Sequence, residues 1–252
     1  ILEAMSCGLT IVATNTVINS ELLDSSRGFL VEPEINSVMN GIKDAIKSQD
    51  YITINMIFAE TYKRNVIYTL DGGCDHCERF LDSLNHLSYG RYNDVFRFFP
   101  SGLPLSNDGH ILPVNGTNLL LYLLYPEQYN GEKIIAKAEK LVMNSKAKWY
   151  KAIISVLLGI IKKDTDRISE NLQNLCVCHT RQQLIWYEIE KTQCHVAYGL
   201  LVLAYHNLAK EEFDKIEMPQ YKTFDSGYCK WLLKEEYEEQ MLFEYSEEYG
   251  IH

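Results

Sequence analysis

The sequence predicts a mostly α fold: a small α/β unit at the N-terminus, followed by an irregular α-helical bundle or a short α-solenoid. Two observations predict this. Up to Val31, short apolar runs that suit strands alternate with glycines and helical segments. From Cys74 onward, apolar residues recur at helical spacing, interrupted by one loop rich in proline and glycine. No fixed repeat period accompanies the helices, which favours an irregular bundle over a tetratricopeptide-type array.

The N-terminal unit is predicted from its glycines and from the apolar runs that they separate. Gly8 stands where the C-cap of a helix needs a positive φ. The β-branched run that follows suits a strand covered on both faces, as in parallel sheets. We therefore expect a helix end, a glycine stop, a strand, a short helix and a second strand at, respectively, Glu3–Met5, Gly8, Leu9–Thr14, Ser20–Leu23 and Phe29–Val31.

Three segments in this order, EAMSCGLTIVAT, INSELL and RGFLVEP, carry a family resemblance. They resemble the C-terminal lobe of the retaining nucleotide-sugar glycosyltransferases with the two-Rossmann (GT-B) fold. The resemblance covers residues 1 to about 65. It implies that residues 1–70 are a Rossmann-like remnant, a partial C-terminal lobe of such an enzyme. The chain begins at Ile1, and we expect it to be the tail of a longer protein.

The resemblance also implies a donor site. Glu3 matches the family glutamate that hydrogen-bonds the ribose of the nucleotide, and Ser20 and Glu21 are expected near the donor loop. A carboxylate suits a ribose because it accepts two hydroxyl donors. No catalytic residue, cofactor or metal is expected, because backbone amides, a helix N-terminus and basic side chains hold the diphosphate. The chain departs from the family at Thr10, usually proline, and we expect it to be inactive by itself.

The second domain is expected over residues 71–252, after the break at Asp71–Gly73. Before this break, helices are predicted over Ser37–Ser48 and Tyr51–Tyr68. Within the domain, residues 100–116 are predicted as a loop because they hold three prolines and three glycines. Helices are predicted over Cys74–Leu87, Arg91–Phe99, Asn118–Tyr125, Glu132–Met143, Lys146–Ile161, Asp166–Leu175, Arg181–Lys191, Cys194–Leu208 and Tyr228–Tyr245.

The helical domain allows an alternative function. Its apolar run Val196–His206, followed by an acidic stretch, Pro219 and a tyrosine-rich segment, is similar to the helical immunity proteins that neutralise bacterial contact-dependent toxins. The 17 tyrosines fit a protein-binding surface and fit a packed helical core equally well. The alternative is therefore a non-enzymatic helical interaction module with a protein partner.

Charge and cysteine usage exclude several classes. The net charge is −10 and no basic face emerges, which argues against nucleic acid as a partner. The apolar runs are too short for a membrane span. Seven scattered cysteines do not form a secreted disulfide framework, so a cytoplasmic location is expected.

Cysteine and histidine cluster at three places: Cys74-Asp-His76-Cys77, Cys176-Val-Cys178-His179 and Cys194-His195. Zinc needs four nitrogen or sulfur ligands, but Cys-x-Cys is not a usual knuckle spacing. Buried thiols are the favoured interpretation, with a metal site or a redox role as alternatives. The other histidines are expected to be structural or on the surface; His110 stands out because it lies in the long loop.

Overall fold

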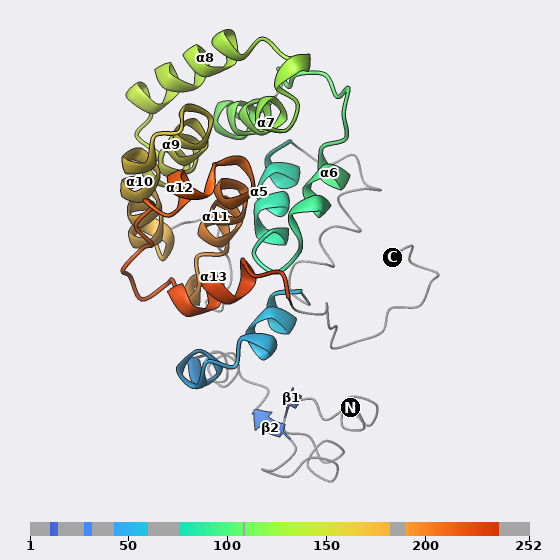
Figure 1. Cartoon of the computed structure of the whole chain (residues 1–252), viewed down its shortest axis with the longest axis vertical. Coiled ribbons are helices and arrows are strands. Elements are labelled where there is room, and N and C mark those ends of the chain that lie inside the picture. Colours follow the sequence, from blue (N-terminus) through green and yellow to red (C-terminus); the bar gives the residue numbers. More distant parts are fainter. Residues whose placement is uncertain are drawn as a thin grey trace.

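The computed structural model describes residues 11–14, 28–31, 43–59, 76–107, 109–181 and 190–236. The described chain is mostly helical, which confirms the mostly α part of the predicted fold class. Figure 1 shows α8 at one end of the long axis and the strands β1 and β2 at the other, with α11 inside the helical body. No helix in these ranges is both long enough and apolar enough to cross a membrane.

The two strands form a parallel pair. β1 spans Ile11–Thr14 and β2 spans Gly28–Val31. Their register places Ile11 opposite Gly28 and Thr14 opposite Val31. Both strands lie within or next to the segments predicted from the β-branched and apolar runs. The two strands are separated by 13 residues, and a parallel pair needs a connection of about a dozen residues or more.

Two short helices follow, over residues 43–48 and 51–59. The second is part of the helical core. Asn55 is buried, and its Nδ2 donates to the Tyr89 carbonyl oxygen at 2.9 Å and to the Tyr228 hydroxyl at 3.1 Å. The Phe58 ring meets the rings of His195 and Tyr228 edge-on. Residues 51–59 lie before the expected domain boundary at residue 70, yet they pack with the helices that follow it.

The next segment is α5 (His76–His86), the short 3-10 turn η1 (Tyr92–Asp94) and α6 (Val95–Phe98). His86 closes this segment: its Nε2 lies 3.0 Å from Asp94 Oδ2, and its Nδ1 lies 2.5 Å from the Tyr89 hydroxyl. His86 therefore contacts both Asp94 and Tyr89, and these contacts lie where the chain turns tightly between α5 and α6.

The helix α7 (Ile111–Leu124) corrects the predicted loop over residues 100–116. The loop ends at His110, whose side chain accepts the Leu112 amide as the N-cap. Pro113 falls in the first turn, where a missing N–H costs no helical bond. Gly116 is needed because a Cβ there would lie 2.5 Å from the Phe80 ring of α5. The proline and glycine that suggested a loop therefore serve the start and the packing of a helix.

A layer of three helices continues the body. The 3-10 turn η2 (Pro126–Gln128) leads into α8 (Gly131–Asn144), then α9 (Lys148–Lys162) and α10 (Thr165–His179). α9 and α10 form a helical hairpin, because they pack along each other and only two residues join them. α7 packs against both α8 and α9.

The last described part holds η3 (Glu190–Thr192), α11 (His195–Asn207), α12 (Lys210–Phe213) and α13 (Ser226–Leu232). Every residue from His195 to Ala204 is buried, so α11 is enclosed on all sides. A Cβ at Gly199 would lie 2.1 Å from the Leu84 carbonyl oxygen, so α11 and α5 meet backbone to backbone at this point.

Two predicted helices end differently or lie outside the described residues. The helix expected over Tyr228–Tyr245 ends at Leu232, and Glu235 has a φ of 51°, which breaks a right-handed helix. Residues 237–252 lie outside the description. So do residues 182–189, which include most of the helix expected over Arg181–Lys191.

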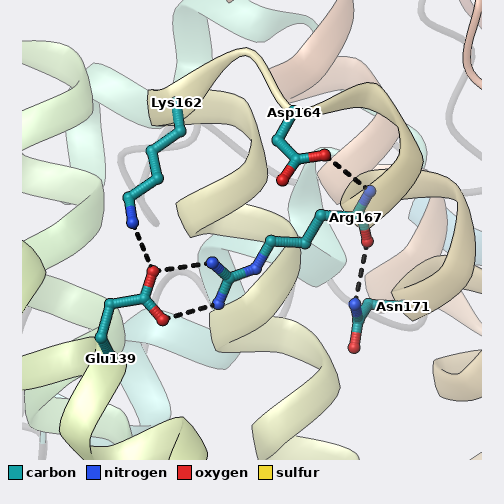
Figure 2. A network of polar contacts seen from close by, with 5 residues as sticks. All are labelled: Glu139, Lys162, Asp164, Arg167 and Asn171. Carbon is teal, nitrogen blue, oxygen red and sulfur yellow. Dashed lines mark hydrogen bonds and ion pairs between the residues drawn. The ribbon is translucent and has the colours of Figure 1, made fainter.

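An ion-pair network joins α8 to the hairpin of α9 and α10 (Figure 2). Arg167 donates two hydrogen bonds to the Glu139 carboxylate, from Nη1 to Oε1 at 2.7 Å and from Nη2 to Oε2 at 3.0 Å. Lys162 Nζ approaches Oε1 at 2.5 Å. These bonds, first of all those from Arg167, lower the pKa of Glu139 from 4.5 to about 2.

Replacing Glu139 by glutamine should destabilise the chain by about 1 kcal/mol at pH 7. The loss of stability is modest because the Glu139 side chain keeps 29% of its surface exposed. Because the pKa of Glu139 is lowered in the folded chain, its ion pairs stabilise the fold above pH 4.5. This stabilisation is lost as the pH falls towards 2. Urea unfolding at pH 7, 4 and 3 should therefore show the gap between wild type and Glu139→Gln shrinking. Glu170→Gln, on an exposed part of α10, should show no such trend.

The packing of residues 51–59 gives a second expectation. Phe58 is only 3% exposed, and Phe58→Ala should lower the free energy of unfolding by about 3 kcal/mol because it empties a site among three helices. Ile52, on the same helix, is 48% exposed, and Ile52→Ala should cost less than about 1 kcal/mol. Denaturant unfolding of both variants measures this. Equal effects would show that the helix does not belong to the core.

Candidate functional site

The residues expected at the donor site, Glu3, Ser20 and Glu21, lie outside the described residues. The structure therefore places β1 and β2 but not these three side chains. Their role stays a prediction from the resemblance. Cys74 also lies outside the description, and so do the side chains of His76 and Cys77 at the start of α5.

The other cysteines and histidines of the predicted clusters do come together. α10 runs on to His179, so Cys176 and His179 lie on its last turn, and Cys194 and His195 begin α11. The loop before α13 holds the two ends in place: the Cys194 amide donates to the Thr223 carbonyl oxygen at 2.7 Å, and Thr223 Oγ1 donates to the Cys176 carbonyl oxygen at 3.0 Å. The Cys194 thiol is within hydrogen-bonding reach of Cys176 and His179.

Burial lowers the chemical reactivity of this cluster. It raises the pKa of the Cys194 thiol well above its ordinary value and lowers the pKa of His195 well below its own. Burial also raises the pKa of Cys178 to about 11 and that of Cys229 to about 12. Neutral thiols are poor nucleophiles and poor metal ligands. In the described part of the chain, no group of three or more His, Cys, Asp or Glu side chains is arranged to hold a metal ion.

Thiol labelling can check this assignment. With iodoacetamide at pH 8, Cys176, Cys194 and Cys229 should stay unmodified in the native chain and react fully in urea, because all three thiols are buried and burial also raises the pKa of Cys194 and Cys229. Peptide mass spectrometry after a short labelling pulse reads each position separately. Rapid native labelling of Cys194 would contradict a packing role and favour a reactive one.

The remaining histidines have structural partners. His110 caps α7, so the residue singled out in the long loop starts a helix. His206 stacks on Tyr92 with ring centroids 4.3 Å apart, and its Nε2 lies 3.0 Å from Glu235 Oε1. His86 sits between Asp94 and Tyr89, as described above. These partners of the three imidazoles include no serine hydroxyl and no cysteine thiol.

The described structure has a basic cavity of about 570 Å³, which we call the lysine pocket. The described residues that line it come from parts of the chain far apart in sequence: the helix of residues 43–48, Thr180 at the end of α10, residues 191–193 in and after η3, and the loop before α13. Four of these nine described residues are lysines, and none of the nine is acidic: Lys43, Ile46, Lys47, Thr180, Lys191, Thr192, Gln193, Lys222 and Thr223.

Two buried polar residues, Gln193 and Thr223, belong to this lining. The Tyr198 hydroxyl donates to Gln193 Oε1 at 2.6 Å, so the amide nitrogen is the end of Gln193 left to donate. Tyr198 is itself fixed, because the Asp225 amide donates to its oxygen at 2.7 Å. Thr223 is held by its bond to Cys176. The inner side of the pocket is thus rigid, while Lys43, Lys47 and Lys222 are exposed at its rim.

Sequence reasoning did not find the lysine pocket, and it argued that no basic face exists. The four lysines are separated by up to 179 positions and follow no known motif. One signal was present: the dipeptide Lys-Thr occurs at Lys191-Thr192 and again at Lys222-Thr223, in two loops that meet.

Comparison of the chain with protein-family models, with curated proteins and with solved structures finds no match.

Proposed function

We propose that residues 1–70 are part of the C-terminal lobe of a retaining GT-B glycosyltransferase, and that the protein carrying this chain transfers a sugar from a nucleotide-sugar donor. The observation that carries the proposal is the parallel pairing of β1 with β2. The motifs that resemble the family predict two adjacent strands at these positions. A parallel pair whose strands are separated by 13 residues supports a Rossmann-like unit over a hairpin or an all-helical segment.

The chemistry of the proposed site rests on binding and on no metal. Glu3 accepts the ribose hydroxyls, and Ser20 and Glu21 lie near the donor loop. Backbone amides and a helix N-terminus hold the diphosphate. In a two-lobed fold the donor lies between the lobes, so we propose that activity requires a second lobe beside residues 1–70, and we place the protein in the cytoplasm.

The helical body supports a second candidate, a non-enzymatic interaction module of the immunity type. Its helices bury an extensive core around α11, and they pack as irregular pairs without a repeat. Irregular helical bundles and solenoids commonly serve as binding scaffolds. In this case the N-terminal unit is an appendage, and the body binds a protein partner.

Donor binding separates the two candidates. The complete polypeptide that contains this chain should bind one of the UDP-, GDP- or ADP-sugars and release the nucleoside diphosphate. Glu3→Gln should weaken donor affinity by about tenfold, because a hydrogen bond to a charged group is lost. Glu211→Gln, an exposed change on α12, is the matched control. Isothermal titration with a donor panel and a coupled assay for released diphosphate measure both effects.

Absence of binding across the panel, with a normal unfolding transition, would contradict the glycosyltransferase proposal and favour the interaction module. Equal donor affinities of Glu3→Gln and wild type would contradict the role of Glu3 alone.

A further inference from the structure

The lysine pocket concentrates positive charge in a chain whose net charge is −10. Lys43 and Lys47 are one helical turn apart on the helix of residues 43–48, and Lys191 and Lys222 approach from two loops. Lys47 has an ion-pair partner of its own: Asp44 Oδ1 lies 2.9 Å from Lys47 Nζ, and both side chains are largely exposed. Like charges gathered in a cavity repel one another, so this arrangement is stabilised when an anion enters.

The lining indicates which anion fits. Lysine ammonium groups bind phosphate as point charges, whereas planar carboxylates are matched by arginine, and the described lining residues include no arginine. Threonine hydroxyls and the Gln193 amide nitrogen add neutral donors to phosphate oxygens. The aliphatic side chain of Ile46 supplies an apolar surface for an organic part of the ligand.

The size of the cavity sets the scale of the ligand. A volume of about 570 Å³ lies within the range typical of pockets for small organic molecules and is far larger than one phosphate ion needs. Four lysines on three segments also exceed what a single phosphate can contact at once.

We propose that the lysine pocket binds a small phosphorylated metabolite that carries at least two phosphate groups, such as a nucleoside diphosphate. The phosphates lie among Lys43, Lys47, Lys191 and Lys222, and the organic part lies against Ile46. The bound ligand clamps the helix of residues 43–48 to the loops that hold α10, α11 and α13. This site is independent of Glu3, Ser20 and Glu21, and it does not require the glycosyltransferase proposal.

Calorimetric titration of the full chain with ADP, pyrophosphate, orthophosphate and citrate, in low-salt buffer without metal, tests the proposal. ADP and pyrophosphate should bind with one site per chain and raise the unfolding temperature. Orthophosphate and citrate should bind at least tenfold more weakly. Raising the salt to about 0.5 M should weaken ADP binding, because exposed ammonium groups contribute much of the attraction.

The double variant Lys43→Ala/Lys222→Ala should weaken ADP binding at least tenfold. Both lysines are exposed, so the unliganded variant should unfold at nearly the wild-type temperature. Lys137→Ala, an exposed lysine on α8 at the other end of the helical body, makes the same kind of charge change and should leave binding unchanged.

Three results would overturn the proposal. The first is no saturable binding of ADP or pyrophosphate at millimolar concentration. The second is citrate or orthophosphate binding as tightly as pyrophosphate, which would show attraction to charge in general or a site for one phosphate. The third is a double variant that binds ADP as tightly as the wild-type chain, which would place the ligand elsewhere.

Discussion

The enclosure of α11 is the constraint on which the helical body depends. A helix that is buried from His195 to Ala204 has no polar stripe to offer solvent, so it is stable only when other helices cover all of its sides. α5, α9, α10 and α12 all contact it, and Phe58 from the N-terminal side covers its first turn. Gly199 makes the closest of these approaches feasible, because any side chain there would meet the backbone of α5. The positions of the surrounding helices are therefore set by the need to cover the buried residues of α11.

Sequence patterns predicted the longer helices. α9, α10 and α11 were found close to their observed bounds because apolar residues recur at helical spacing in α10 and form long apolar runs in α9 and α11. α7 was found only in its second half. Pro113 and Gly116 are typical of loops. The neighbouring sequence does not show that Pro113 lies in the first turn of α7 or that Gly116 faces Phe80. The short helix α12 was missed, because its four residues are too few to show a period.

The candidate sites show the same division. The cysteine and histidine pairs were visible as motifs, and the structure brings two of them together as buried side chains. The lysine pocket was not visible, because each of its lysines is an ordinary surface residue in its own segment. Only the folded chain brings Lys43 near Lys222. Charge totals hide such a site, since an acidic chain can still assemble a basic cavity from three distant segments.

Asn55 ties together parts of the chain that a sequence-based division would separate. Its side chain bonds both to the turn after α5 and to α13, 173 positions away. The helical body therefore cannot be transplanted onto another protein at a junction between residues 60 and 75. A fusion made there would leave the body without the polar bridge and the ring of Phe58 that close it. Any exchange of this module between proteins has to carry residues 51–59 along with it.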